Sequence, residues 1–328
     1  MRKIQLLFIF SLLFLCTTAG GAQLRQIAII DVPGRPGFDS LAFAANDLVI
    51  AHTAAGTVDV FDPAKRRIIV QIKNLDEPRG LAVDEQAGKV YVACSGSNRI
   101  IAISTRDWNV SDTIELNDEP DFLLLTPLTG TLYVANSHNS SVSALNPKTH
   151  AVRTADVGGR PQAFAYDSDR NLLYVTIEDQ NQIVALTPDL TRAKTFPLHG
   201  SIPTGIAFDP KMRHLFVAVR SAVLVLNADA GLELSRIPTE EGIDQVWFDD
   251  STRSAFACAS NGTVTMISQQ NGRYVAEQEL NTTVRGHTVA FDPVRNFVYL
   301  PGGFEGRSKL VILKRVETPP ATAKASLK

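Results

Sequence analysis

The chain is predicted to fold as an all-β, seven-bladed β-propeller of four-stranded antiparallel blades, because one short motif recurs seven times at nearly equal spacing. The clearest copies are Pro78–Asp84, Pro161–Asp167 and Pro203–Asp209. The last residue of each copy serves as a register position, and these positions are Ala44, Asp84, Thr126, Asp167, Asp209, Asp249 and Asp292. Their spacings are 40, 42, 41, 42, 40 and 43 residues. Such a period is typical of four-stranded blades, and no helical periodicity accompanies it.

Each copy carries the signals of four strands in a fixed order. The first strand ends at the register position, and the second centres on a position seven residues later. In six copies that position holds an aromatic residue, namely Tyr91, Tyr133, Tyr174, Phe216, Phe256 and Tyr299, and Val49 is its counterpart in a slightly shortened first copy. A turn-like segment such as Ser95–Asn98 follows, then a third strand such as Ile100–Ile103 and a fourth such as Asp112–Leu116. β-branched and aromatic residues dominate these runs, as they do in strands.

Small side chains dominate the position two residues before the register. Its occupants are Ala42, Ala82, Leu124, Ala165, Ala207, Trp247 and Ala290. The first strand of a blade lies nearest the axis, where neighbouring sheets converge, so small residues are expected there. Leu124 and Trp247 depart from this pattern, and the sequence offers no reason for either.

The two ends of the repeat predict how the ring closes. The seventh copy supplies only three strands, Thr288–Phe291, Phe297–Leu300 and Lys309–Lys314, while the chain begins with an unmatched strand, Gln26–Val32. We expect the N-terminal strand to complete the last blade beside Lys309–Lys314, because this arrangement leaves no open sheet edge between the ends of the array.

The strand motifs also carry a family resemblance. The runs Leu132–Asn136 and Leu173–Thr176, each preceded by a Pro-x-x-hydrophobic-Ala-aromatic-Asp type of segment, resemble the YVTN family of β-propellers over residues 26–316. The resemblance implies an exported bacterial protein. It does not imply one activity, because a single propeller scaffold hosts ligand binding, partner docking and hydrolysis.

The N-terminus has the features of a secretory signal peptide, residues 1–22. Arg2 and Lys3 precede an apolar run, Ile4–Leu15, and small residues lead to a cleavage site after Ala22. The apolar run is shorter than the roughly 20 residues that cross a bilayer, so no membrane span is predicted. The domains expected are this signal, the propeller over 23–316 and a disordered tail over 317–328, in a periplasmic or secreted protein.

Charge and cysteine content limit the partners. Removal of Arg2 and Lys3 with the signal moves the formal charge from -2 to -4. A mildly acidic protein does not favour nucleic-acid binding, which depends on many Lys and Arg contacts to phosphate. Cys94 and Cys258 fall on blades two and six, so we expect both to be free and buried rather than bridged. We expect the protein to be a monomer.

Polar residues recur five positions before the register, at the start of every innermost strand. They are Asp39, Arg79, Asp121, Gln162, Thr204, Asp244 and His287. One interpretation is that a water-filled mouth simply needs polar side chains. A second interpretation is a ligand site on blades seven, one, two and three, because the end of the second strand is also polar there, as at His52 and Asn136. The predicted ligand-binding residues are Asp39, His52, Arg79, Asp121, Asn136 and His287.

These residue types suit more than one chemistry. Arg79 is suited to clamp an anion through two hydrogen bonds, or to pair with Asp39 or Asp121. The carboxylates and imidazoles are possible metal ligands, but the chain has no zinc, haem, dithiol, Gly-x-Ser-x-Gly or Gly-rich phosphate motif. We therefore predict no cofactor and a non-catalytic binding or scaffold protein that recognises a small ligand or a protein at its loop-rich face. The alternative is a metal-assisted lactonase-like hydrolase or lyase with a divalent ion near the axis.

Overall fold

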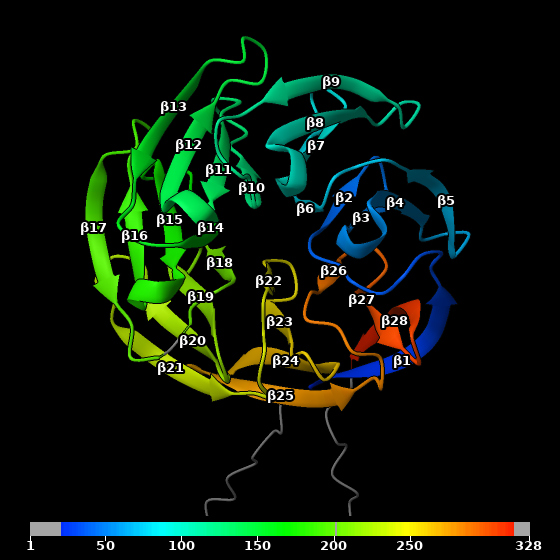
Figure 1. Ribbon diagram of the computed structural model, residues 1–328. Coiled ribbons are helices and arrows are strands. Elements are labelled where there is room, and N and C mark those ends of the chain that lie inside the picture. Colours follow the sequence, from blue (N-terminus) through cyan, green and yellow to red (C-terminus); the bar gives the residue numbers. More distant parts are fainter. Residues whose placement is uncertain (1–20, 201, 318–328) are drawn as a thin grey trace, which may run out of the picture.

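Seven four-stranded sheets surround a central axis in the computed structural model, which describes residues 21–200 and 202–317 (Figure 1). This confirms the predicted seven-bladed β-propeller. The predicted signal peptide and C-terminal tail lie almost wholly outside the described residues. Within those residues, no helix has the length and apolar character needed to cross a membrane.

Every blade is a four-stranded antiparallel sheet. Six of the sheets consist of four consecutive strands, and the seventh combines the last three strands with β1. Blades one to three consist of β2 (Leu41–Ala44), β3 (Asp47–His52), β4 (Thr57–Asp62), β5 (Arg67–Ile72); β6 (Pro78–Asp84), β7 (Lys89–Cys94), β8 (Arg99–Ser104), β9 (Val110–Glu115); β10 (Phe122–Leu125), β11 (Leu132–Asn136), β12 (Ser141–Leu145) and β13 (Val152–Asp156). Blades four to six consist of β14 (Pro161–Asp167), β15 (Leu172–Ile177), β16 (Gln182–Leu186), β17 (Arg192–Pro197); β18 (Ile206–Asp209), β19 (His214–Val219), β20 (Ala222–Asn227), β21 (Glu233–Pro238); β22 (Val246–Asp249), β23 (Ser254–Cys258), β24 (Thr263–Gln270) and β25 (Arg273–Asn281). Blade seven consists of β26 (Ala290–Asp292), β27 (Phe297–Phe304), β28 (Arg307–Glu317) and β1 (Ala22–Asp31).

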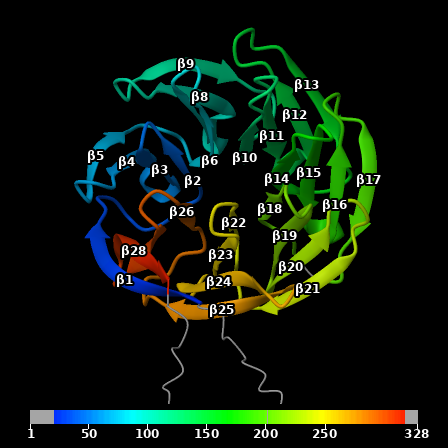
Figure 2. The ribbon, with the colours of Figure 1, turned by 180° about the vertical axis from the view of Figure 1, so that it is seen from behind.

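The ring closes through the N-terminal strand, as predicted. β1 runs antiparallel to β28, with Asp31 opposite Lys309 and Ala22 opposite Glu317. Strands from the two ends of the chain therefore share one sheet, in which β1 lies outermost. Both views show the first strand of each blade around the axis and the fourth strands, with β1, at the rim (Figures 1 and 2).

The register aspartates shape the turn that leads from the first strand to the second. The Asp209 carboxylate accepts hydrogen bonds from the backbone N–H groups of Lys211 and Met212 at 3.0 and 3.1 Å. The next residue, Arg213, then adopts a left-handed conformation with φ of 56°. Such side-chain-to-backbone bonds are why aspartate is favoured at turns. Aspartate occupies the register position in five of the seven copies, where it can serve this local role in the turn.

The same aspartates also tie neighbouring blades together. Arg253 of blade six donates to the fully buried Asp209 carboxylate of blade five through both terminal guanidinium nitrogens, one of them at 2.8 Å from Oδ1. Arg213 of blade five similarly reaches the buried Asp167 of blade four at 2.6 Å. Charged hydrogen bonds of this kind link sheets that otherwise meet through apolar packing.

The core consists of apolar clusters between adjacent blades rather than one central core. The aromatic side chain of the second strand is buried in six blades, at Tyr91, Tyr133, Tyr174, Phe216, Phe256 and Tyr299. Cys94 and Cys258 are both free and buried, which confirms the prediction that they do not bridge. Because apolar packing fills the space between the blades, function must lie at the faces or along the axis.

Candidate functional site

The seven polar residues that begin the inner strands form a ring around the axis, which we call the collar. Six of them line one cavity of about 200 Å³, namely Asp39, Arg79, Asp121, Gln162, Thr204 and Asp244. The seventh, His287, contacts the cavity wall through a 3.2 Å contact between its Nδ1 and Asp244 Oδ2. Residues that share one position of the sequence repeat thus line a single concave surface, and small ligands typically bind to such surfaces.

Hydrogen bonds from the preceding blade hold several collar positions in place. The hydroxyls of Thr53, Ser95 and Ser137 donate to the carbonyl oxygens of Pro78, Pro120 and Pro161 at 2.6, 2.6 and 2.7 Å. Each of these prolines directly precedes a collar residue. The hydroxyl residues begin the short 3₁₀ helices η1 (Thr53–Ala55), η2 (Ser95–Ser97) and η3 (Ser137–Asn139), which connect the second and third strands. A loop of one blade therefore fixes the collar residue of the next, a link that the sequence analysis missed.

Two collar acids have cationic partners. The Arg79 Nη1 lies 3.4 Å from Asp121 Oδ1, and its Nη2 lies 3.4 Å from Glu77. The Ser137 hydroxyl donates to the other Asp121 oxygen at 2.8 Å. Asp244 is paired with His287. Of the two roles open to Arg79 in the sequence, the structure displays the ion pair with Asp121.

Asp39 is the collar acid without a cationic partner. Among the described residues its carboxylate has one hydrogen bond, a 3.4 Å contact from the neighbouring Ser40 hydroxyl. Burial in the narrow mouth, followed by the negative charges of Asp244 and Asp121, raises the pKa of Asp39 to about 7, although His287 and Arg79 oppose the effect. Burial is also the largest influence on His287 and acts to lower its pKa, but Asp244 and Asp39 together raise it. The collar therefore holds an excess of negative charge.

Sequence reasoning selected only part of the collar. Asp39, Arg79, Asp121 and His287 were predicted as ligand-binding residues, and the structure brings all four together. Gln162, Thr204 and Asp244 belong to the same surface. These three residues occupy the same position of the repeat as the other collar residues. The sequence analysis left them out of the predicted site because it placed the ligand site on blades seven, one, two and three.

His52 and Asn136, the other two predicted site residues, are fully buried inside their blades. The His52 ring stacks on Phe38 with centroids 4.1 Å apart, and the Asn136 amide donates to Ser141 and Ser143 at 3.0 and 2.9 Å. The last residue of the second strand points into the packing of its blade throughout, because the equivalent Cys94, Ile177 and Val219 are also buried. The structure thus separates both residues from the collar cavity.

The surroundings of His52 contain a Ser-His-Asp grouping that is structural. His52 Nδ1 lies 2.8 Å from Asp59 Oδ2, and its Nε2 lies 3.4 Å from the Ser308 hydroxyl. However, Nε2 is 2.7 Å from the carbonyl oxygen of Arg35, which can only accept, and the Ser308 hydroxyl donates to Gly34 at 2.9 Å. The imidazole is therefore not available as a base for the serine, and His52, Asp59 and Ser308 are all buried. The grouping fastens the segment between β1 and β2 to blades one and seven.

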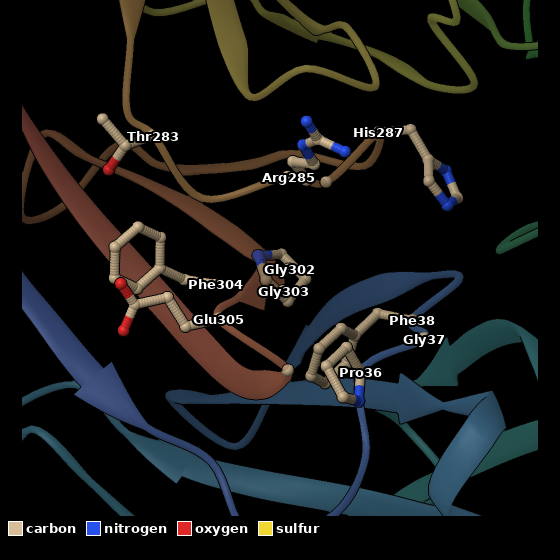
Figure 3. A pocket seen from close by; sticks show the side chains of 13 residues that line it. Pro36, Gly37, Phe38, Thr283, Arg285, His287, Gly302, Gly303, Phe304 and Glu305 are labelled. Atoms are coloured by element: carbon tan, nitrogen blue, oxygen red, sulfur yellow. The ribbon is translucent and has the colours of Figure 1, made fainter.

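A second concavity, of about 670 Å³, lies beside the collar on blade seven (Figure 3). His287 and Arg285 lie on one segment of its wall, Phe304 and Glu305 on the β27–β28 hairpin, and Phe38 on the segment before β2. Its floor depends on glycine, since a Cβ at Gly302 would stand 2.3 Å from the carbonyl oxygen of Arg285. His287 thus borders both this groove and the collar.

The described residues do not provide a clustered set of metal ligands. Within residues 21–200 and 202–317, no three His, Cys, Asp or Glu side chains are grouped closely enough to hold one metal ion. The collar acids are spread around a ring on separate blades, with Arg79 between two of them.

Comparison with known proteins places the chain among β-propellers. The family model described as NHL repeat matches residues 75–102, which cover the first and second strands of blade two and most of the third. Protein NirF of Pseudomonas aeruginosa is 23% identical over 131 residues, which cover 39% of this chain and 33% of NirF. YncE of Salmonella typhimurium is 25% identical over 136 residues, which cover 39% of this chain and 38% of YncE. The matched segments thus span 33% and 38% of the two relatives' lengths.

Solved structures resemble almost the whole chain in fold. Hydrazine synthase of Kuenenia stuttgartiensis superposes with a TM-score of 0.74 and 13% identity, covering 89% of this chain and 98% of that one. Virginiamycin B lyase of Staphylococcus aureus gives a TM-score of 0.74 and 14% identity, covering 90% and 100%. At these identities the likeness concerns the fold alone.

Proposed function

We propose that this protein is an exported β-propeller that binds a small ligand in the collar cavity and does not act on it chemically. The observation that carries the proposal is Asp39, an acid without a cationic partner in a concave site where Asp121 and Asp244 each have one. Holding a carboxyl there at a raised pKa costs stability, and such costs are typical of functional sites. The sequence resemblance to NirF and YncE is consistent with a propeller that serves as a binding protein or scaffold.

Binding is favoured over metal-assisted hydrolysis by the donor geometry. The described residues offer no group of three side chains for a divalent ion, and the collar alternates acids with Arg79, Gln162 and Thr204. This mixture of donors and acceptors suits recognition through hydrogen bonds and charge. Export remains part of the proposal and depends on the signal-like segment in residues 1–22.

The test is a ligand screen against a variant whose collar cavity is filled. Gln162 lines the cavity and is half-buried, so Gln162→Trp should fill the mouth, whereas Gln269→Trp adds the same bulk at an exposed site on blade six. Mixtures of amino acids, amines, sugars and carboxylates are screened by saturation-transfer NMR. We expect compounds that bind the wild type and Gln269→Trp to lose binding to Gln162→Trp. Binding that survives filling, or no binding from any class, contradicts the proposal.

A further inference from the structure

The collar cavity adjoins a second, more apolar cavity. This inner cavity has a volume of about 250 Å³ and shares Phe122, Ala163 and Gln245 as walls with the collar cavity. The order follows from the chain itself, because two residues after a collar residue each inner strand presents an apolar one, as at Leu41, Leu81, Ile206 and Val246. The two adjoining cavities, which together we call the axial cavity, therefore have a charged mouth and an apolar interior.

Aromatic side chains dominate the interior. Phe122, Phe208, Trp247 and Phe248 line the inner cavity, and all four are only partly buried. Trp247 occupies the position where five of the seven blades carry alanine. Its ring meets Phe43 edge-on, with centroids 6.1 Å apart. The inner cavity leaves room for the indole near the axis. This explains why a large residue can replace alanine at position 247.

The charges at the mouth favour a cation. Three acids, Asp39, Asp121 and Asp244, face one arginine and one histidine, so the mouth is negative whenever Asp39 is ionised, even when His287 is charged. Arg79 is committed to Asp121 and His287 to Asp244, which leaves Asp39 as the one collar acid that an incoming positive charge would pair. Aromatic faces further attract organic cations, because the face of an aromatic ring carries partial negative charge.

We propose that the axial cavity binds an organic cation with an apolar body, an amine or quaternary ammonium compound. Its charged group lies against Asp39, and its body enters the inner cavity beside Trp247. This inference rests on the proposed function and adds the chemical class of the ligand. An inorganic metal ion is a different ligand class, for which the described residues provide no three-donor group.

The proton on Asp39 should compete with the ligand. The groups that face Asp39 are Asp244, Asp121, His287 and Arg79, and burial together with the two acids raises its pKa to about 7. Binding of a cation requires the ionised carboxylate, so lower pH must weaken binding. The ionised fraction falls about tenfold between pH 8 and pH 6 for such a pKa, and the affinity should fall by about the same factor. His287, whose pKa is also raised, becomes more positively charged as the pH falls, which acts in the same direction.

Trp247 provides the assay, because the chain has only two tryptophans. In a Trp108→Phe background its fluorescence reports directly on the inner cavity. The probes are benzyltrimethylammonium, benzyl alcohol and benzoate, which share the aromatic ring and differ in charge. We expect benzyltrimethylammonium to bind at least tenfold more tightly than benzyl alcohol at pH 8, and about tenfold more weakly at pH 6 than at pH 8.

Two variants separate the collar charge from a general surface effect. Asp39→Asn should abolish the preference for the cation and its pH dependence, while Glu305→Gln, which removes one exposed acid from the neighbouring groove, should change neither. If benzyl alcohol or benzoate binds as tightly as the cation, or Asp39→Asn keeps the preference, the cation inference is wrong while ligand binding on the axis stands. If none of the three probes binds at millimolar concentration, the inference is also overturned, and the wider screen with Gln162→Trp judges the proposed function separately.

Discussion

Replacing Asp39 with asparagine should stabilise the folded protein above pH 7 and leave its stability nearly unchanged near pH 4. Burial, and then Asp244 and Asp121, raise the pKa of Asp39 from 3.8 to about 7 in the folded state. Between these values the folded protein holds a proton that the unfolded chain releases, so the free energy of unfolding falls as the pH rises through this window. A difference of about 3 in pKa corresponds to about 4 kcal/mol, which is the upper limit of the gain from Asp39→Asn at pH 8.

The assay is urea unfolding of the wild type and Asp39→Asn at pH 4, 6 and 8, followed by circular dichroism. The difference in unfolding free energy should grow steadily with pH, while Glu305→Gln, at an exposed position, should show no such trend. His287 also has a raised pKa, and its stabilising effect is lost as the pH rises, so some pH dependence should persist in the variant. A difference that stays constant from pH 4 to pH 8 would refute the reasoning, and one that reverses sign would mean that Asp39 is ion-paired.

Three further predictions concern the scaffold. Arg253→Met should cost about 3 kcal/mol in urea unfolding at pH 7, because it strands the buried Asp209 carboxylate, and a loss below 1 kcal/mol would contradict the buried pair. Protein lacking residues 1–22 should show two free thiols per chain when it is unfolded without reductant. The native protein should react slowly with thiol reagents, because burial raises the pKa of Cys94 to about 12 and also raises the pKa of Cys258. If the unfolded protein shows no free thiols, the two cysteines form a disulfide. Deletion of residues 23–33 should leave β28 without its outer neighbour and promote aggregation in light scattering, and a monomer with unchanged melting temperature would argue against closure by β1.

The repeat was readable because each blade is a local unit. The aspartate that binds the next turn, the aromatic of the second strand and the alternation within each strand lie within about 20 residues of one another, so their spacing alone counts the blades. The closure of the ring could also be predicted from the sequence. Pairing the unmatched N-terminal strand with the three-stranded last blade is the arrangement that gives every blade four strands. The collar residues could be picked out with the same register, because each stands five positions before a register residue, at the start of an inner strand.

The partners of the collar residues were decided by contacts between blades. The sequence could not say whether Arg79 faces Asp39 or Asp121, and the difference is what leaves Asp39 without a cationic partner. Nor could it show that His52 turns inward to stack on Phe38, which reaches it from the segment before β2.

The sequence by itself therefore determined the number of blades, their closure and the ring of polar residues, since periodicity and strand alternation act within one repeat. Only the tertiary structure decided which acid stays unpaired and that Trp247 opens onto the axis, because both depend on how strands of different blades converge. Distances between side chains on separate blades are set by the packing of the whole ring, which no single repeat contains.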